Sequence, residues 1–282
     1  MNIAIVGATG NVGRKMLEVL EQKKLSIDEL YLVASSKSAG KKINFNGKHY
    51  EVYNLETFDF SKAQISFFAA GSEISEEYAL KAAKDSTVID NSSFFRMDPD
   101  VPLIVPQVNS EDAKNLKKNI IANPNCSTAQ LVIALKPLHD LFNIERVVIS
   151  TYQSVSGAGK ASMDELIEQT KQFLNNEEIK SINFTKQIAF NAIPHIDVFS
   201  DDGYTKEELK MVNETKKILD NKIKVTATCV RIPVLVSHAE SVNIQFEKSF
   251  TLEKVRSALE NAEGCEVIDQ RENGGYITPF EA

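Results

Sequence analysis

Residues 2–13 read NIAIVGATGNVG, and this stretch decides the fold. Residues 2–6 form a short apolar run typical of a buried strand, and the residues after the turn, as far as Lys24, repeat apolar side chains at helical spacing. Glycines in the spacing Gly-x-x-Gly-x-x-Gly lie between the expected strand and the expected helix. Such a turn lets the backbone approach a pyrophosphate closely, and the helix N-terminus then binds it. The stretch predicts a dinucleotide-binding domain, with an ordinary strand–helix turn as the alternative.

The cofactor type is indicated by the end of the second expected strand, residues 29–34. An acidic residue there would bind the ribose 2′-hydroxyl of NAD. The chain has hydroxyls and a lysine instead, at Ser35, Ser36, Lys37 and Ser38. These side chains suit a 2′-phosphate, so the sequence favours NADP, with a solvated polar loop as the alternative. In the first turn we expect cofactor contacts from Gly7, Thr9, Gly10, Asn11, Val12 and Gly13.

The order of apolar runs predicts two domains. As far as residue 127, short runs at 65–69, 88–89, 103–105 and 120–122 alternate with helical patterns at 76–84 and 110–117. This alternation is typical of a doubly wound parallel sheet. Later strands are longer, at 146–153, 225–232 and 240–246, between helices at 128–142, 162–175, 206–220 and 252–260. We therefore predict an α/β protein with a Rossmann-like NADP-binding domain over 1–127 and an α+β catalytic and dimerisation domain over 128–282.

The composition argues against several classes of protein. An apolar fraction of 43% supports a packed core. The sequence contains no run of about 18 apolar residues, so it predicts no membrane span. A net charge of −7 without a basic stripe argues against a nucleic-acid partner. The first strand follows Met1 almost at once, so we expect no signal peptide. Cysteines that are few and far apart argue against disulfides and a metal site, and for the reducing cytoplasm.

Cys126 lies in the string NPNCST, residues 123–128, directly ahead of the apolar run 131–135. A proline and an asparagine are turn residues, so the string predicts a loop that becomes a helix at the cysteine. A thiol there faces unpaired backbone N–H groups and the positive end of the helix dipole, which both favour the thiolate. A thiolate beside a nicotinamide is suited to aldehyde–acyl phosphate oxidoreduction. A buried, inert cysteine is the alternative, and we prefer that interpretation for Cys229 and Cys265.

Two polar residues interrupt an apolar stretch later in the chain. Arg231 lies in the expected strand 225–232, where a charge needs a partner. His238 follows after a turn, and a histidine titrates near neutrality and relays protons. A structural role stays open for each residue taken alone. The other histidines have less local support for a catalytic role: His49, His139 and His195.

Several long strings make the chain similar to the bacterial aspartate-semialdehyde dehydrogenase family. They are residues 7–13, DNSSFFRM at 90–97, VPQVN at 105–109, NPNCST at 123–128, YQSVSGAG at 152–159, EELK at 207–210 and RIPVLVSH at 231–238. The strings follow one another in the family's order along the whole chain. A chance match of this kind is negligible.

The resemblance implies an NADP-dependent enzyme that reduces L-aspartyl-4-phosphate to L-aspartate-4-semialdehyde and phosphate. The reaction feeds lysine synthesis (through diaminopimelate) and the synthesis of threonine and methionine. Cys126 then matches the nucleophile that forms an acyl-thioester, which hydride converts to a thiohemiacetal that collapses to the aldehyde. His238 matches the acid/base residue. Gln153 matches the residue that orients the substrate, and Asn125 helps to hold it.

The resemblance also assigns the two charged ends of the amino acid. Arg231 matches the clamp on the α-carboxylate, which explains a guanidinium in an apolar strand. Glu207 matches the residue that holds the substrate's ammonium. Glu208 and Glu214 are its rivals, since the register of the match is not fixed.

Further residues match the phosphate and cofactor contacts. Arg96 and Lys210 match phosphate-binding residues, with plain surface charge as the alternative for each. Ser156 and Gly157 match residues that line the cofactor. Neighbouring lysines compete with Lys210 for its role: Lys206, Lys216 and Lys217.

The resemblance bears on assembly and length as well. The family is usually a homodimer built largely through the second domain, which we expect here. Its members continue for several dozen residues past the string TPF at 278–280, with a strand and a last helix that returns to the cofactor domain. We therefore expect residues 1–282 alone to be less active than the longer proteins, with a less stable first domain.

Other functions stay open at this point. N-acetyl-γ-glutamyl-phosphate reductase uses the same thiol and histidine on a different acyl phosphate, but residues 91–96 and 207–210 favour the aspartyl enzyme. A phosphorylating glyceraldehyde dehydrogenase fits less well, because STAQ follows Cys126. A non-catalytic NADP-binding paralogue or redox-sensing protein belongs to a different class. It would have no need to keep Cys126, Gln153, Arg231 and His238 together.

Overall fold

The structure is a computed structural model that describes residues 1–272 and 274–282. It divides into two units, Met1–Pro124 and Asn125–Ala282. The boundary lies ahead of the one expected after residue 127, because the helix that carries Cys126 begins at that residue and belongs to the second unit. Within the described residues, every helix falls short of the length and apolar composition that a membrane span requires.

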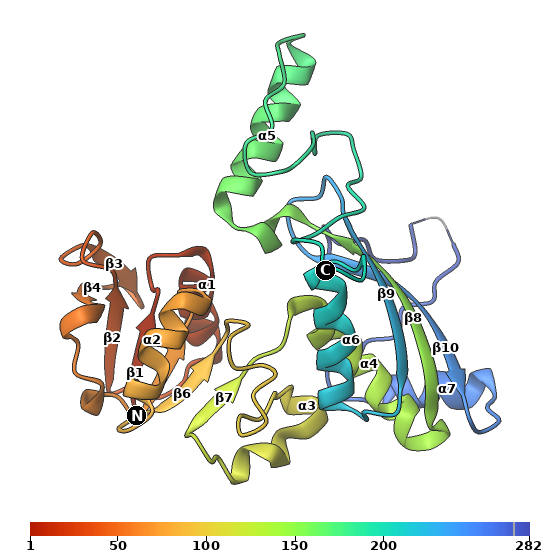
Figure 1. Cartoon of the computed structure of the whole chain (residues 1–282), viewed down its shortest axis with the longest axis horizontal. Coiled ribbons are helices and arrows are strands. Elements are labelled where there is room, and N and C mark those ends of the chain that lie inside the picture. Colours follow the sequence, from red (N-terminus) through yellow and green to blue (C-terminus); the bar gives the residue numbers. More distant parts are fainter. Residues whose placement is uncertain (273) are drawn as a thin grey trace. The chain divides into compact units, whose positions relative to one another are not determined.

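The first unit is built on a seven-stranded sheet with the order β3-β4-β2-β1-β5-β6-β7. The strands are β1 (Asn2–Val6), β2 (Glu29–Ala34), β3 (Lys42–Phe45), β4 (Lys48–Asn54), β5 (Ile65–Phe68), β6 (Thr87–Asp90) and β7 (Ile120–Ala122). All neighbouring pairs are parallel except the β3–β4 hairpin at one edge. Figure 1 shows these strands in red to yellow.

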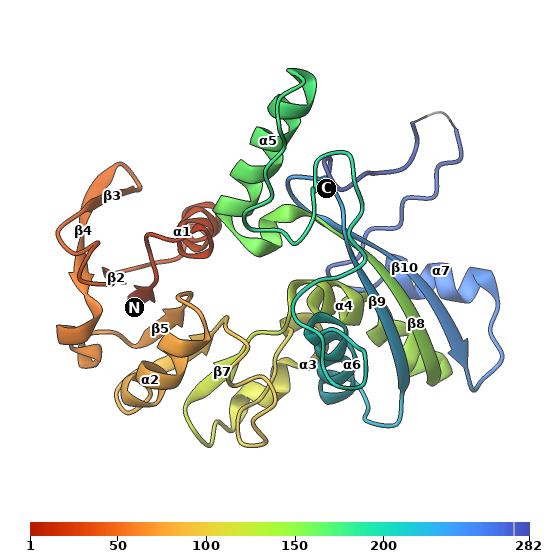
Figure 2. The ribbon, with the colours of Figure 1, turned by 45° about the horizontal axis from the view of Figure 1, so that its top comes forward.

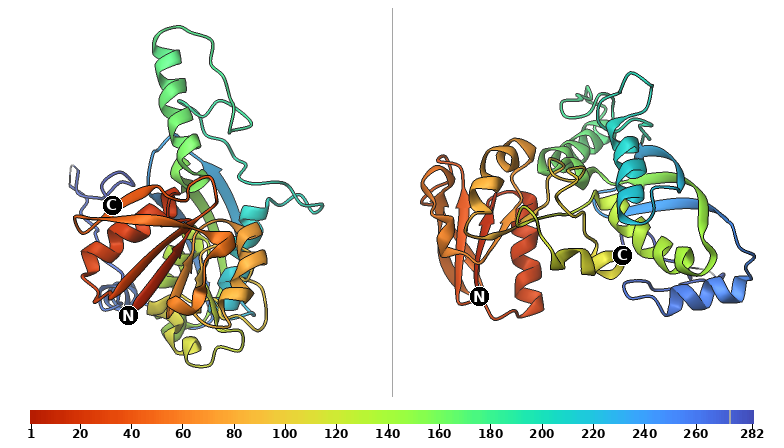
Figure 3. Two further views of the ribbon diagram at one scale, coloured as in Figure 1. Left: turned by 90° about the vertical axis from the view of Figure 1, so that its left-hand side faces the viewer. Right: turned by 60° about the horizontal axis from the view of Figure 1, so that its bottom comes forward.

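Helices cover both faces of this sheet. α1 (Asn11–Lys23) connects β1 to β2, and α2 (Ser72–Ala82) connects β5 to β6 on the other side of β1. Right-handed crossovers that run in opposite directions place the two helices on opposite faces, as Figure 3 shows. The strand order therefore reverses at β1, the position at which doubly wound sheets bind nucleotides. The expected doubly wound α/β fold is confirmed.

The connections of the first unit differ from expectation in places. The run 103–105 is not a strand, since only Leu103 forms an isolated bridge, to Ala122. Pro106 follows this run and begins the short helix α3 (Pro106–Asn109), because proline is suited to the first position of a helix. The helix expected over 110–117 is the 3₁₀ turn η3 (Ser110–Lys114). Two further 3₁₀ turns are η1 (Leu55–Thr57) and η2 (Phe60–Lys62).

The second unit has a three-stranded sheet with two of its helices against one face. Its strands are β8 (Ile144–Gln153), β9 (Lys224–Arg231) and β10 (His238–Phe246), and its helices are α4 (Cys126–Phe142), α5 (Lys160–Leu174), α6 (Lys206–Ile218) and α7 (Leu252–Glu260). The 3₁₀ turn η4 (Val155–Ala158) leads from β8 to α5. β8 is central, antiparallel to β10 and parallel to β9. Figure 2 shows α4 and α6 against the same face of this sheet.

The core of the second unit lies between that face and the helices. Val147 and Ile149 of β8 pack with Leu131 and Leu135 of α4 and with Met211 of α6, and all of these side chains are buried. The strand therefore alternates between side chains that face the helices and side chains that face away. This alternation decides which residues of β8 meet the start of α4.

One acidic residue shares this inner face. Glu240 lies opposite Thr151 in the pairing of β10 with β8, and Cys229 of β9 continues the same row. Gln130 of α4 donates its Nε2–H to Glu240 Oε1 at 2.9 Å. Burial raises the pKa of Glu240 to about 7, and the hydrogen bond from Gln130 offsets this in part. The folded chain therefore favours the protonated carboxyl.

We expect Glu240→Gln to stabilise the protein at alkaline pH. Because the folded pKa of Glu240 lies above its ordinary value, the stability that it contributes is full below about pH 4.5 and is lost as pH rises through about 7. Glutamine stays neutral and still accepts the hydrogen bond of Gln130. The melting temperature of the variant should exceed that of the native chain by about 2–4 °C at about pH 8.5 and match it at about pH 5. The exposed Glu178→Gln serves as the control, and an equal shift at both pH values would contradict the assignment.

Candidate active site

One row across the three-stranded sheet brings together three of the expected residues. His238, the first residue of β10, lies opposite Gln153, the last residue of β8. Gln153 in turn lies beside Arg231, the last residue of β9. Gln153 and Arg231 are buried. Side chains of one row point to the same face, so these three groups meet where the sheet faces α4.

The start of α4 supplies the thiol. Asn125 is the N-cap, and its Oδ1 accepts hydrogen bonds from the N–H groups of Ser127 at 2.9 Å and Thr128 at 3.4 Å. This cap begins the helix at Cys126, two residues earlier than expected. Cys126 Sγ lies 3.1 Å from His238 Nε2. The structure thus joins two residues that are 112 positions apart in the sequence.

The backbone of Ser154 holds the histidine and the arginine. Its N–H donates to His238 Nδ1 at 3.0 Å, and its carbonyl accepts from Arg231 Nη1 at 2.6 Å. A backbone N–H can only donate, so this contact favours the neutral ring with its proton on Nε2, toward the sulfur. Gly157 leaves the space that both side chains need, because a Cβ there would lie 3.1 Å from Arg231 Nη1 and 3.5 Å from His238 Nε2.

The ionisation of the pair differs from the sequence expectation. Cys126 is open to solvent on one side, but the protein packed around its other sides raises the pKa of the thiol, and the Glu207 carboxylate raises it further. The Ser127 N–H and the Arg231 cation act in the opposite direction and are outweighed. Burial lowers the pKa of His238, and Arg231 lowers it further, against the Ser237 backbone and Glu207. The N–H groups of the helix start favour the thiolate as expected, but burial and Glu207 outweigh them, so thiol and imidazole are both neutral near pH 7.

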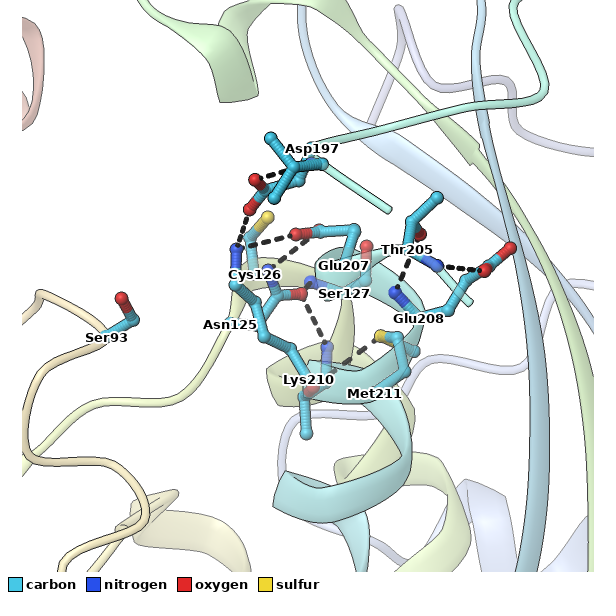
Figure 4. Close-up of polar contacts among 12 residues, drawn as sticks. Ser93, Asn125, Cys126, Ser127, Asp197, Thr205, Glu207, Glu208, Lys210 and Met211 are labelled. Atoms are coloured by element: carbon cyan, nitrogen blue, oxygen red, sulfur yellow. Dashed lines mark hydrogen bonds and ion pairs between the residues drawn. The ribbon is translucent and has the colours of Figure 1, made fainter. Parts of the chain in front are cut away.

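Glu207 on α6 links the polar groups of the site. Its Oε1 accepts from Asn125 Nδ2 at 2.8 Å and from Gln153 Nε2 at 3.2 Å. Its Oε2 pairs with Lys210 Nζ at 3.2 Å, and Lys210 also pairs with Asp197 at 2.8 Å. Figure 4 shows this chain of contacts from Asp197 through Lys210 and Glu207 to Asn125, beside Cys126. Glu207 is buried, so an unsatisfied carboxylate here would be costly.

The rivals of Glu207 occupy different positions. Glu208 forms a capping box with Thr205 at the start of α6, with bonds of 2.8 and 3.3 Å. It also accepts the N–H of Cys229 at 3.2 Å. Glu214 accepts the backbone N–H of Asn125 at 2.6 Å. Of the three acids, Glu207 is therefore the one that contacts Gln153 and Lys210.

Arg231 is a buried cation in this set. Burial lowers the pKa of its guanidinium, and the charge of Glu207 raises it in part, followed by Cys126 and Cys229. The apolar strand therefore does not hold an isolated charge. It holds one that is hydrogen-bonded to a carbonyl and balanced by a nearby carboxylate.

Arg96 belongs to the first unit. Its Nε donates to the carbonyl of Asn123 at 2.9 Å and its Nη2 to the carbonyl of Asn91 at 3.2 Å. It is buried and supports the backbone at the ends of β6 and β7. Asn123 stands three residues before Cys126 in the sequence, so Arg96 stabilises the segment that leads to the thiol.

The first unit carries the expected dinucleotide turn at the end of β1. Gly7 has a φ of +86°, and a Cβ there would lie 2.7 Å from the carbonyl oxygen of Ala69. A Cβ at Gly13 would lie 2.4 Å from the oxygen of Gly7. Within the described residues, the start of α1 at Asn11 has neither a side-chain cap nor an acidic residue in its first turn. Its N–H groups are therefore suited to a pyrophosphate, and the turn fits the group.

The loop after β2 lies beside this turn. The Gly7 N–H donates to the carbonyl of Val33 at 2.8 Å, which ties the glycine turn to the carboxyl end of β2. The next residues form a tight turn in which Ser38 N donates to Ser35 O at 2.8 Å. Ser35, Ser36 and Lys37 are exposed, so their hydroxyls and ammonium are accessible to a ligand.

Sequence reasoning missed several residues of the site. Ser154 acts through its peptide group, which its residue type does not reveal. Asp197 lies 13 residues before its partner Lys210, in a loop without periodicity. The sequence names Glu214 only as a rival of Glu207, although its place two helical turns after Glu207 puts both residues on one face of α6.

The remaining cysteines and histidines lie outside the site. Cys229 is buried as expected, whereas Cys265 is only partly buried. His139 accepts the N–H of Ile144 at 3.0 Å and therefore supports the start of β8. His195 stacks on Phe199 with ring centroids 4.5 Å apart.

Family comparisons agree with this architecture. The family described as semialdehyde dehydrogenase, NAD binding domain, matches residues 2–116. The family described as semialdehyde dehydrogenase, dimerisation domain, matches residues 135–282. The two matches correspond to the two units of the structure.

Individual relatives carry a more specific name. Aspartate-semialdehyde dehydrogenase of Aquifex aeolicus is 54% identical over 99% of this chain and 84% of its own length. The crystal structure of aspartate semialdehyde dehydrogenase II of Vibrio cholerae, complexed with ASA, has a TM-score of 0.92 at 50% identity, covering 98% of this chain and 85% of that one. The enzyme of Candida albicans, solved with NADP, has a TM-score of 0.67 at 26% identity, covering 92% and 76%. This chain belongs to the aspartate-semialdehyde dehydrogenase family.

Proposed function

We propose that this protein is an NADP-dependent aspartate-semialdehyde dehydrogenase that reduces L-aspartyl-4-phosphate to L-aspartate-4-semialdehyde and phosphate. The reaction serves the synthesis of lysine, threonine and methionine in the cytoplasm. The observation that carries the proposal is the contact of Cys126 with His238 at 3.1 Å, within reach of the buried groups of Arg231 and Glu207. A nucleophile, a proton donor, a cation and an anion thus converge on one point.

The thiol forms the covalent intermediate. Cys126 Sγ attacks the acyl carbon, a C–S bond forms, the C–O bond to phosphate breaks, and the thiol proton leaves with the phosphate. When NADPH is bound, it supplies the hydride that reduces the thioester. His238 donates its Nε2 proton to the oxyanion that hydride transfer leaves, and takes that proton back from the thiohemiacetal hydroxyl as the C–S bond breaks. The Cys126 thiolate that is released then takes a proton from solvent, which restores the thiol.

The charged residues fit the ends of the substrate. Arg231 binds the α-carboxylate, and Glu207 binds the α-ammonium in exchange for its present amide partners. From the resemblance we assign Arg96 of the first unit and Lys210 of the second, each by itself, to the phosphate, with Lys210 leaving Asp197 for the anion. Gln153 and Asn125 contact both Glu207 and the region of the thiol, so they orient the reacting carbonyl.

Glu207 also discriminates between acyl phosphates. A buried carboxylate stabilises a free ammonium strongly, and it gains much less from a neutral acetamide. An N-acetylated substrate would also place its acetyl group against Asn125 and Gln153. The site therefore favours the aspartyl substrate over the N-acetyl-γ-glutamyl substrate.

The cofactor assignment rests on the first unit. Gly7, Thr9, Gly10, Asn11, Val12 and Gly13 hold the pyrophosphate, and Ser35, Ser36, Lys37 and Ser38 hold the 2′-phosphate of NADP. The exposed Lys37 at the carboxyl end of β2 supports this choice, because an ammonium attracts a phosphate. Ser156 and Gly157 of η4 line the nicotinamide side, next to His238. A relative solved with NADP supports the same cofactor.

The proposal is tested by phosphate-dependent reduction of NADP⁺ with L-aspartate-4-semialdehyde. We expect turnover in the native chain, and a loss of at least about 10³-fold in kcat for Cys126→Ala, because the acyl-enzyme cannot form. Cys265→Ala is the matched control and should retain activity.

Other outcomes would separate the alternatives. Faster turnover of N-acetylglutamate semialdehyde would favour the acetylated acyl phosphate. Cofactor binding without turnover of either aldehyde would favour a non-catalytic paralogue. Faster reduction of NAD⁺ than of NADP⁺ would contradict the cofactor assignment.

The ionisation of the resting thiol gives a second test. Because surrounding protein and the Glu207 charge raise the pKa of Cys126, alkylation by iodoacetamide should reach half its maximal rate above the ordinary pH of 9.0. Glu207→Gln removes one negative charge and should lower that midpoint. Exposed Glu178→Gln should leave it unchanged. A midpoint near pH 7 in the native chain would show an activated thiolate and contradict the neutral pair.

We also propose that the protein forms a homodimer through the second unit. The face of its sheet that points away from α4 and α6 carries mainly small and hydroxyl side chains, in rows such as Ser241, Ser150 and Thr228. Tyr152 on this face is 42% exposed. A sheet face of this composition fits packing against a second sheet, and the match to a dimerisation domain over residues 135–282 supports association through the second unit.

The dimer is tested at the centre of that face. Ser150→Arg adds a bulky charge between the two sheets and should convert the dimer to a monomer in light scattering after size exclusion. Ser257→Arg on α7 is exposed and should leave the dimer intact. An unchanged molar mass for Ser150→Arg would show that the interface lies elsewhere.

A further inference from the structure

One face of α6 contacts the segment that carries the nucleophile at successive turns. Glu207, Met211 and Glu214 are spaced four and three residues apart, so they form a single stripe on the helix. Glu207 accepts from Asn125 Nδ2, and Met211 Sδ accepts from the hydroxyl of Thr128 at 3.5 Å. Glu214 accepts from the backbone N–H of Asn125. The stripe therefore holds the residues on both sides of Cys126.

Glu214 makes the shortest of these contacts. Its Oε2 lies 2.6 Å from the Asn125 nitrogen, and it is 1% exposed. The Asn125 N–H lies outside the hydrogen bonds of α4, because it belongs to the N-cap residue. A buried N–H of this kind needs an acceptor, and a carboxylate gives a stronger bond than a carbonyl or a hydroxyl.

Packing alone would not call for a carboxylate at this position. Met211, one turn away on the same stripe, is apolar and 0% exposed, and an apolar side chain would fill the position of Glu214 at lower cost. Among the groups that this acid contacts is the backbone N–H of Asn125, the residue directly before the nucleophile.

We propose that Glu214 is a positioning residue that fixes the backbone of Asn125, the residue before Cys126, and thereby keeps the sulfur in contact with His238. The proposal rests on the proposed function in one respect, the role of Cys126 as nucleophile. It assigns different tasks to the two acids of the stripe. Glu207 holds the Asn125 side chain in a contact that the substrate's ammonium replaces, whereas Glu214 holds the Asn125 backbone throughout.

This division has a consequence for the catalytic cycle. When Glu207 turns to the substrate, Asn125 Nδ2 loses an acceptor, and the cap of α4 would otherwise be free to shift. The Glu214 contact with the backbone is independent of that exchange. The thiol therefore stays in place at the moment when the acyl carbon arrives, and a misplacement of about 1 Å can cost about 10²-fold in rate.

The test compares three variants in the full chain. Glu214→Gln keeps an acceptor oxygen for the Asn125 N–H and should retain most of kcat. Glu214→Leu removes the acceptor, and Glu214→Asp withdraws it by one methylene while it keeps the charge. For both we expect kcat to fall by about 10- to 100-fold with KM changed by less than about threefold. Glu208→Gln, a structural acid on the same helix, should keep kcat.

A readout without substrate separates this proposal from the proposed function. The pH midpoint of Cys126 alkylation should shift on His238→Asn in the native background, because the imidazole contacts the sulfur. In Glu214→Asp and Glu214→Leu the same histidine change should produce a much smaller shift. Rates are normalised to the fraction of Cys126 that is alkylated at completion, so that unfolded chains do not contribute.

The outcomes are decisive in both directions. The proposal is supported if the shift that His238→Asn causes is lost in Glu214→Asp and Glu214→Leu and is kept in Glu214→Gln. This holds even if the substrate is another acyl phosphate. A full histidine-dependent shift and native kcat in Glu214→Asp would overturn it. A kcat loss that only follows the folded fraction would show a purely structural role and would overturn it as well.

Discussion

The pairing of β8 with both of its neighbours is the constraint on which the candidate site depends. β10 in antiparallel register and β9 in parallel register place His238, Gln153 and Arg231 in one row. A slip of one residue in either pair would turn a member of the row to the opposite face. The alternating burial of β8 fixes this register, because Val147 and Ile149 must face the core while Tyr152 must not. The packing of the hydrophobic core therefore determines how the side chains of the candidate site are arranged.

The electrostatics of the row explain how the proposed nucleophile can rest in its protonated form. Burial raises the pKa of Cys126 and the Glu207 charge raises it further, so the thiol keeps its proton. A cationic group that binds Glu207 offsets this negative charge. Binding of an ammonium and activation of the thiol are then linked, since each favours the other by the same free energy. The Ser127 N–H at the helix start adds to this activation but does not produce it alone.

The sequence predicts the elements well and their long-range contacts poorly. Strands 2–6, 29–34 and 120–122 and the helix 252–260 have the bounds that the sequence pattern indicates. The three strands bury an apolar run that is visible locally, whereas the helix has no buried residue. The polar, hairpin-like stretch around His49 is the β3–β4 hairpin, whose first strand alternates exposed polar and buried apolar residues. The thiol and histidine are identified by type and context, but their separation of 112 residues makes the contact a property of the fold. The ionisation of Cys126 is predicted wrongly, because the helix dipole is visible in the sequence and the approach of Glu207 from α6 is not.

Of the acidic residues on α6, one contributes to stability and two serve the candidate site. Glu208 caps the helix and contacts the β9 backbone, so it contributes to folding. Glu207 and Glu214 face the core at positions where apolar residues would stabilise the unit more. Their carboxylates are balanced by Lys210, by Asn125 and by the start of α4, where the helix dipole favours negative charge. The start of α4, which was expected to activate the thiol, thus also stabilises the carboxylates of α6 that keep the thiol protonated. The protonation state of Cys126 results from the competition between these two effects.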